Sequence, residues 1–261
     1  STRKESSAAS DVYKRQIISA VSAACLSYTA LLKILDLVFS INSAHEAGYI
    51  CSILFIIPGF PFITSGIDLA KLDLRSGLER LTYAIIIILV ATMFAWIMAL
   101  LLDLQPLTFT SMSLNPILLL CLRIIASFCG VFGFSIMFNS TIPMAAIAAL
   151  IGAVANTFRL ELIDFTGMPP AAAAFIGALS AGLLASEIKK NNGYPRISLT
   201  VPSIVIMVPG LYLYRAIYNF GIMSLTEAVS WFTSAIMIII MLPLGLIFAR
   251  ILTDRTFRFC T

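Results

Sequence analysis

The chain has 261 residues, of which 60% are hydrophobic and 11% charged, and its mean hydropathy is +0.99. Soluble domains carry about 25% charged residues, and a water-soluble fold of this length cannot bury so much apolar surface. The composition therefore excludes a soluble protein and predicts a membrane protein. The net charge of +4 is small, and in this class it reports topology, so we expect no nucleic-acid partner.

Residue patterns typical of enzymes and cofactor sites are missing from the sequence. His45 is the only histidine, and the five cysteines form no CxxC pair and no metal-ligand spacing. There is no GxxxxGK[ST] phosphate loop, no GxGxxG and no GxSxG. We therefore expect neither an enzyme nor an ATP-driven pump, and no metal or other cofactor.

The first sixteen residues, STRKESSAASDVYKRQ, are polar and low in complexity, and the apolar IISAVSAAC follows them abruptly. They resemble translated vector or adaptor sequence, so residues 1–16 are interpreted as a non-native segment outside the fold. On this interpretation the natural protein begins further upstream and the chain is a fragment.

Apolar runs that are long enough to cross a bilayer as helices recur along the rest of the chain. They predict an all-α polytopic membrane protein with about eight transmembrane helices, at residues 17–39, 47–66, 81–102, 115–138, 141–158, 168–188, 197–216 and 227–252. Cations gather after the second and sixth spans and at the C-terminus, as Lys71, Arg75, Arg80, Lys189, Lys190, Arg196, Arg250, Arg255 and Arg258. By the positive-inside rule, both ends of the chain are cytoplasmic.

Two of these spans are interrupted by proline and glycine, at Pro58-Gly59 and at Pro209-Gly210. Proline has no amide hydrogen and excludes the carbonyl four residues earlier. We therefore expect free carbonyls at Leu54, Ile57 and Val205, opposite Pro58, Pro61 and Pro209. Free carbonyls are tolerated in a membrane where they face a polar cavity or a ligand. The alternative is a simple proline kink, which is common in membrane helices.

The interrupted spans are related by a constant offset (209 − 58 = 151), which also aligns Asp68 with Asn219. The same offset aligns TYAIIII at 82–88 with TSAIMII at 233–239. We interpret the offset as an internal duplication. Because corresponding spans are five spans apart, an odd number, the two copies take opposite orientations in the membrane. Such inverted repeats are typical of secondary transporters, whose substrates bind where interrupted helices meet.

Further polar residues lie inside the apolar spans. Asn156, Arg159, Glu161 and Asp164 come at the end of the fifth span, and Arg123 lies deeper in the fourth. Ionisable groups within a membrane are functional candidates by default. The residues from Arg159 to Asp164 either pair with one another at an interface or form a gate or a carboxylate-binding arginine.

Four segments resemble the threonine/serine exporter family: IPGFPFITSGIDLAKLDLRSGLERL, GAVANTFRLEL, MPPAAAAFIGALSAGLLAS and GYPRISLTVPSIVIMVPGLYLYRAIYN. The resemblance covers about residues 17–252. It implies ten spans in two five-helix halves after a cytoplasmic domain, and export of threonine and serine across the bacterial inner membrane, driven by the proton motive force. This chain lacks the first two spans and that domain. Residues 17–103 would then be the last three helices of the first repeat, and residues 104–261 the five-helix second repeat.

The resemblance and the interrupted spans together predict a site for a small amino acid, with protons as the coupling ion. Helix ends would offer backbone donors to the carboxylate and acceptors to the ammonium group. The expected site residues are Pro58, Gly59, Pro61, Thr64, Ser65, Asp68, Asn156, Arg159, Glu161, Asp164, Pro209, Gly210, Tyr212, Tyr214, Arg215 and Asn219. The alternative is a membrane subunit or scaffold that does not transport alone and needs a partner chain, either the missing N-terminal half or a second copy.

Asp68 is the residue expected to carry the coupling proton, because its counterpart Asn219 cannot titrate. The other interpretation is that Asp68 pairs with Lys71, three residues further along, at the cytoplasmic surface.

Overall fold

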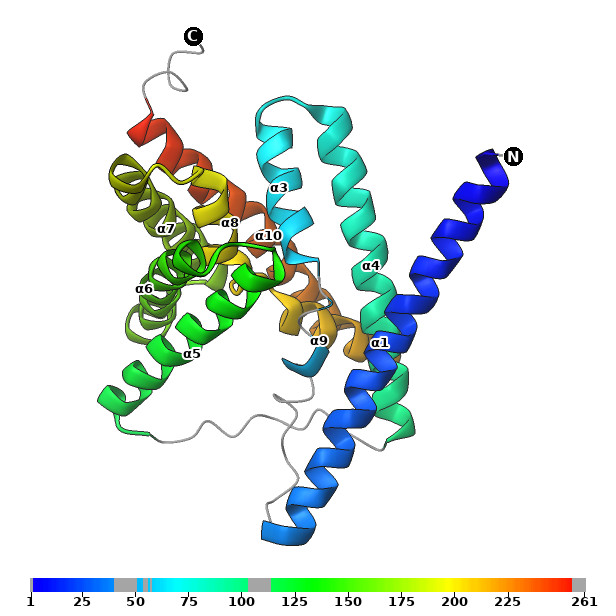
Figure 1. The fold of residues 1–261 in the computed structure, drawn as a ribbon. Helices are drawn as coiled ribbons and strands as arrows, with labels where there is room; N and C mark the ends of the chain where they lie inside the picture. Colours follow the sequence, from blue (N-terminus) through cyan, green and yellow to red (C-terminus); the bar gives the residue numbers. More distant parts are fainter. Residues whose placement is uncertain (1, 40–50, 54–55, 57, 103–113, 255–261) are drawn as a thin grey trace. The chain divides into compact units, whose positions relative to one another are not determined.

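The computed structural model describes residues 2–39, 51–53, 56, 58–102 and 114–254, and within these ranges it contains helices and no strand (Figure 1). The helices are α1 (Thr2–Phe39), α3 (Gly59–Ala70), α4 (Leu74–Leu101), α5 (Pro116–Met137), α6 (Ile142–Thr166), α7 (Pro170–Asn192), α8 (Arg196–Val205), α9 (Gly210–Gly221) and α10 (Leu225–Thr253). Helix α1 therefore includes most of the first sixteen residues.

Six helices of the described part are long and apolar enough to cross a membrane: residues 15–34 of α1, α4, α5, α6, residues 170–188 of α7, and α10. Helices α8 and α9 pass this test only together, as a seventh and interrupted span. The predicted all-α polytopic membrane fold is thus confirmed, and the chain is a multi-pass membrane protein. Seven of the eight predicted spans have a counterpart; the remaining one, 47–66, lies partly outside the described residues.

The chain forms two compact units, and neither unit is continuous in sequence. Unit 1 comprises residues 1–58, 82–112 and 210–232, and unit 2 comprises residues 59–81, 113–209 and 233–261. Helices α4 and α10 each pass from one unit into the other. The units therefore do not coincide with the two halves of the sequence, because each unit contains segments from both.

Small residues at helical spacing build the core of unit 1. Val21 and Cys25 of α1 are buried together with Ala91, Ala95 and Ala99 of α4. A spacing of four places these side chains on one face of each helix. Small side chains on such a face let two helices approach closely, which is how helices associate where lipid removes the hydrophobic driving force.

Helix α6 is central in unit 2, where it packs against α5, α7 and α8, and α3 also packs against α8. Close packing in this unit depends on glycine. A Cβ placed on Gly152 of α6 would lie 2.8 Å from the carbonyl oxygen of Ser203 in α8. One placed on Gly245 of α10 would lie 2.5 Å from the carbonyl oxygen of Phe175 in α7. At these two glycines the helices therefore pack backbone against backbone.

The two interrupted segments have the same secondary structure at the same offset of 151 residues. Helices α3 and α9 both have 12 residues, and α4 and α10 begin at Leu74 and Leu225. The turns also agree, since Leu72 and Met223 take left-handed backbone angles of φ 62° and φ 61°. Non-glycine residues rarely adopt this conformation. Its presence at both positions is independent of the side-chain matches from which the duplication was inferred.

The two short helices that follow the interruptions each pack against the more distant long helix. In unit 2, Gly66 of α3 lies against Pro243 in the second half of α10, where an added Cβ would be 2.4 Å from the proline ring. In unit 1, Gly221 of α9 lies against Trp96 in the second half of α4. Helix α3 therefore packs against α10, and α9 packs against α4.

The packing around Gly245 predicts a large difference between two Gly→Ala variants. Gly245→Ala forces the backbone of α7 to move and should lower the free energy of unfolding by about 1–3 kcal/mol. Gly133→Ala in α5 has nothing within 4 Å of the new methyl group, so it should be neutral or stabilising by up to about 1 kcal/mol. Thermal unfolding of both variants in detergent checks this. Equal melting temperatures would contradict the close α7–α10 contact.

Candidate functional site

The interrupted start of α3 meets the interrupted end of α8 within unit 2. Gly59 is the first residue of α3, and a Cβ placed on it would lie 3.2 Å from Val205 and 3.3 Å from Val208. A larger residue would push the two helix ends apart. The contact brings a helix N-terminus, whose first amide groups have no partner within the helix, to a helix C-terminus.

The carbonyl of Val205, expected to be free because of Pro209, is hydrogen-bonded in the structure. It accepts from the backbone amide of Val208 at 3.1 Å, and the carbonyl of Ile204 accepts from Met207 at 2.9 Å. This part of the prediction was wrong. Tighter turns after α8, with hydrogen bonds to the carbonyl three residues earlier, replace the helical bond that proline excludes. The carbonyls of Leu54 and Ile57 lie outside the described residues.

The end of α8 also contacts the polar segment of α6. Around Gly177 of α7, an added Cβ would lie 3.1 Å from the Cβ of Arg159 and 3.3 Å from the sulfur of Met207. Arg159 of α6 and Met207, just beyond α8, are therefore neighbours across a glycine. Within unit 2, the start of α3, the end of α8 and Arg159 of α6 are thus linked by successive contacts.

Asn156, also on α6, is buried and has unused hydrogen-bonding capacity. Its side chain is 8% exposed, and its amide nitrogen donates to Ser127 Oγ of α5 at 2.9 Å. Its Oδ1 has no hydrogen-bond partner among the described groups, and the same holds for Oγ1 of the buried Thr157. Buried polar atoms without partners are uncommon and are candidates for binding a ligand or water.

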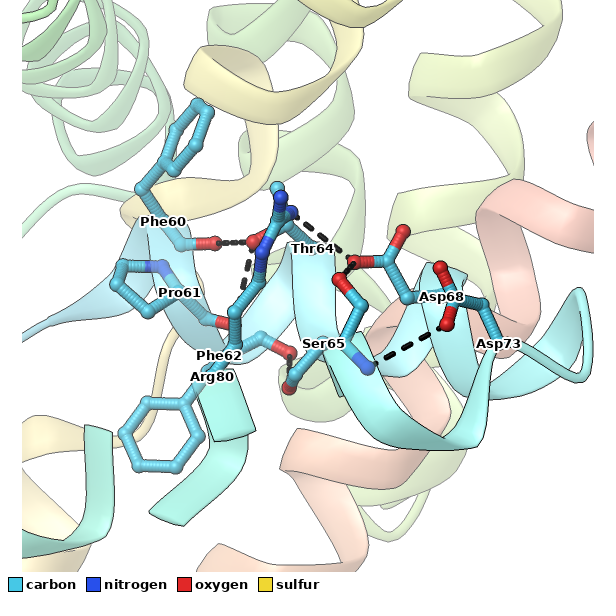
Figure 2. A network of polar contacts seen from close by, with 9 residues as sticks. Phe60, Pro61, Phe62, Thr64, Ser65, Asp68, Asp73 and Arg80 are labelled. Atoms are coloured by element: carbon cyan, nitrogen blue, oxygen red, sulfur yellow. Dashed lines mark hydrogen bonds and ion pairs between the residues drawn. The ribbon is translucent and has the colours of Figure 1, made fainter. Parts of the chain in front are cut away.

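Thr64 and Ser65 of α3 are buried, and their hydroxyl groups bond to their own helix (Figure 2). Thr64 Oγ1 donates to the carbonyl of Phe60 at 3.0 Å, and Ser65 Oγ donates to that of Phe62 at 2.9 Å. Pro61 lies in the first turn of the same helix, where its missing amide hydrogen costs nothing. The two hydroxyls satisfy carbonyls of α3, and their oxygens can still accept a hydrogen bond.

Asp68 pairs with Arg80 at the start of α4 (Figure 2). Its Oδ2 lies 3.0 Å from Nη1 of Arg80 and accepts from Ser76 Oγ at 3.3 Å. The Asp68 side chain is 18% exposed and that of Arg80 is 50% exposed. The partner is thus not Lys71, because the left-handed turn at Leu72 brings α4 back alongside α3. The pair fastens the hairpin formed by the two helices.

Arg123 of α5 holds two carboxylates of α6. Its Nη1 donates to Glu161 at 2.8 Å, and its Nη2 donates to Asp164. Of the two alternatives for residues 159–164, the pairing with Arg159 is replaced for Glu161 and Asp164 by pairing with the neighbouring helix. An arginine that spans two carboxylates fixes the register between α5 and α6.

The predicted residues of α9 lie in unit 1, where Trp231 of α10 is the shared partner of two of them. The ring of Tyr212 meets that of Trp231 edge to face, with centroids 5.3 Å apart, and the guanidinium of Arg215 lies 4.7 Å from the indole centroid. Tyr214 is buried in the core of the unit, and Asn219 donates to the carbonyl of Arg215 at 2.8 Å. These contacts hold α9 against the start of α10.

Several polar residues of the site were not predicted from the sequence, namely Ser127, Thr157 and Ser203, and Arg123 was noted only as a deep cation. A signal for part of this set exists in α5, where Arg123, Ser127 and Ser135 recur at multiples of four and share one face. The described residues contain no group of three or more metal-ligating side chains. The arrangement offers hydrogen-bonding groups and charges, as binding of a small polar molecule requires.

Two family models match the chain. The model described as "Threonine/Serine exporter, ThrE" matches residues 123–252, and a second threonine/serine exporter model matches residues 9–102. The chain belongs to the threonine/serine exporter family. No match was found among curated proteins or among solved structures. Membership in this exporter family gives the chain a role in transport across the membrane.

The ion pairs of Arg123 predict an order of stability among variants of this exporter. Arg123→Gln leaves Glu161 and Asp164 without their donor and should lower the free energy of unfolding by about 1–3 kcal/mol. Glu161→Gln should cost more than Asp164→Asn, because the Glu161 side chain is 22% exposed and that of Asp164 is 47% exposed. Melting temperatures in detergent give the order.

Arg75→Gln is the matched control for this series. Arg75 pairs with Glu79 on the surface, at side-chain exposures of 90% and 69%, and such a pair contributes about 0–1 kcal/mol. If the Arg123→Gln and Arg75→Gln variants had the same melting temperature, the two carboxylate bonds of Arg123 would have no stabilising role.

Proposed function

We propose that the chain is the membrane domain of a secondary exporter of small hydrophilic amino acids, threonine and serine, driven by the proton motive force. It would lie in the bacterial inner membrane with both ends in the cytoplasm. The observation that carries the proposal is the meeting of the α3 start with the α8 end at Gly59 and Val205. Interrupted helices that meet inside a membrane protein are the usual place for a substrate of a secondary transporter.

A zwitterionic amino acid needs hydrogen-bond donors for its carboxylate and acceptors for its ammonium group. The first turn of α3 has amide groups without helical partners, and a helix N-terminus favours an anion. Acceptors are available close to α8, since Oδ1 of Asn156 is buried without a partner in the described part of the chain. A substrate hydroxyl, present in both threonine and serine, adds one donor and one acceptor. These groups suit a hydroxyl-bearing amino acid better than an apolar one.

Alternating access between two inverted copies is the proposed mechanism. The agreement of α3 with α9 and of α4 with α10 supports a duplication. The exchange of the short helices supports coupled movement, because displacing α3 moves the second half of α10 through the Gly66–Pro243 contact. The odd number of spans between the copies favours opposite orientations.

Efflux of labelled threonine and serine tests the proposal. Cells loaded with a dipeptide that releases either amino acid should export it slowly when the gene is deleted, and re-expression of the full natural protein should restore the rate. Gly59→Val should fail to restore it, since its side chain would separate α3 from α8, whereas Gly133→Ala should succeed. Unchanged efflux in the deletion strain, with no gain on expression, would refute the proposal. Efflux that also requires a second chain would assign this one a subunit role.

The proton is proposed to bind Asp68. Asp68→Asn should fold normally, because a partly exposed ion pair with Arg80 contributes about 0–1 kcal/mol. It should lose efflux driven by a pH gradient while the exchange of internal for external substrate survives. Asp73→Asn is the matched control: it is exposed, lies in the same hairpin and makes one weak bond, from the amide of Ser76 at 3.4 Å. If efflux by the Asp68→Asn variant kept the pH dependence of the wild type, Asp68 would not carry the proton. Glu161 and Asp164 would then be the candidate residues.

A further inference from the structure

A cavity of about 200 Å³ lies in unit 2, between the end of α3, the start of α8 and the end of α10. Three cations line it, namely Lys71, Arg196 and Arg250, and Asp254 is the one acidic side chain in its lining. Most of the remaining wall is made by isoleucine, leucine and alanine side chains. The cavity is thus separate from the meeting point of Gly59 with Val205.

The positive charge of the cavity is not balanced by its own carboxylate. Asp254 lies 3.8 Å from Nε of Arg250, which leaves an excess of two positive charges in the lining. Arg196 is held in place by bonds to Thr253 Oγ1 at 3.0 Å and to the carbonyl of Gly182 at 3.3 Å. Like charges gathered in one cavity raise its affinity for an anion.

The start of α8 adds to this charge. Arg196 is its first residue, and the preceding Pro195 supplies no side-chain cap for the amide groups of the first turn. Uncapped amide groups at a helix N-terminus carry partial positive charge and bind phosphate and carboxylate groups. The amide of Ser198 donates to the carbonyl of Pro195 at 3.1 Å, so the donors that the helix start adds to the cation-lined cavity are the amides before it.

The duplicated copy provides an internal comparison, because the offset of 151 residues assigns each cavity position a counterpart in unit 1. Ala70 and Ile247 correspond to Gly221 and Trp96, and there the indole lies directly against the glycine. Lys71 and Arg250 correspond to Ile222 and Ala99. At these positions unit 1 has glycine, tryptophan, isoleucine and alanine, so Lys71 and Arg250 are not requirements of the shared fold. The counterparts of Arg196 and Asp254 lie outside the residues that the structure describes.

We propose that this cavity binds a phosphate-class anion, and that the phosphate of an anionic phospholipid is its source in the membrane. Cations at one end and apolar side chains around them match a molecule that is charged at one end and apolar at the other. Basic pockets between transmembrane helices bind lipid head groups in this way. A free phosphate ion would use the cations and leave the apolar wall without a role.

Thermal unfolding of the delipidated protein in detergent separates the two sources. Phosphatidylglycerol should raise the melting temperature at a concentration about tenfold lower than phosphatidylcholine, since ligands that bind the folded state stabilise it. Inorganic phosphate should protect only at far higher concentration. Equal protection by phosphatidylglycerol and phosphatidylcholine, with none by phosphate, would overturn the proposal. Stabilisation by inorganic phosphate but by neither lipid would support an anion site and overturn its assignment to a lipid.

Two kinds of variant locate the binding. Lys71→Gln and Arg250→Gln should each weaken the selectivity for phosphatidylglycerol by about tenfold, as the loss of one charged hydrogen bond predicts. Arg75→Gln removes the same charge from the exposed part of the same hairpin and should retain the wild-type selectivity. An equal loss in Arg75→Gln would show that surface charge, and not the cavity, selects the lipid.

The second variant fills the cavity without changing any charge. Ala70→Gly combined with Ile247→Trp introduces the pair that stands at these positions in the other copy. The indole should occupy the space and abolish the difference between the two lipids, while the melting temperature without lipid stays close to wild type. Full selectivity in this double variant would overturn the proposal, because the cations alone would then suffice. The readout is lipid binding and is independent of any export activity.

Discussion

A broken helix inside a membrane must have its ends covered by protein, because lipid offers no hydrogen bonds to exposed backbone groups. The architecture of unit 2 follows from this constraint. The end of α8 closes on itself through the bonds from Met207 to Ile204 and from Val208 to Val205, and Gly59 lets the start of α3 lie directly against it. Gly152 lets α6 lie against α8, and Gly245 lets α10 lie against α7.

The same constraint applies to both interrupted segments, which share a backbone conformation and differ in side chains. Turn geometry, helix bounds and the left-handed residues at 72 and 223 agree between them, since each is needed to reverse the chain after a short helix. The side-chain contacts that stabilise the two chain reversals are different. Asp68 with Arg80 is an ion pair, whereas the counterpart positions hold Asn219 and Trp231, and Trp231 is contacted by Arg215 through its ring.

Much of this fold could be predicted from hydropathy and proline positions. Seven spans, the offset of 151 residues and the breaks before Gly59 and Gly210 follow from local sequence, because they depend on apolar length and on the chemistry of proline. The partners of charged residues could not be obtained in this way. Arg80 replaces Lys71 as the partner of Asp68 because the turn at Leu72 reverses the chain, and Arg123 reaches Glu161 and Asp164 because α5 and α6 are antiparallel. Such contacts depend on three-dimensional register, which spacing along one helix does not contain. The exchange of α3 and α9 between units is likewise invisible in a linear comparison of the copies.

The chemical difference between the two hairpins bears on how a proton could act on one copy alone. Protonation of Asp68 removes its negative charge and with it the attraction to Arg80, while Ser76 can still bond to the carboxyl group. In the other hairpin, the guanidinium of Arg215 contacts the indole of Trp231, and no carboxyl group takes part in this contact. On the proposal that Asp68 binds the coupling proton, the proton would weaken the hairpin of α3 and leave the Arg215–Trp231 contact unchanged. Because α3 packs against the second half of α10 at Pro243, this change would reach the helix that follows the second interruption. On that proposal, the exchange of the short helices would let a proton on one repeat affect both.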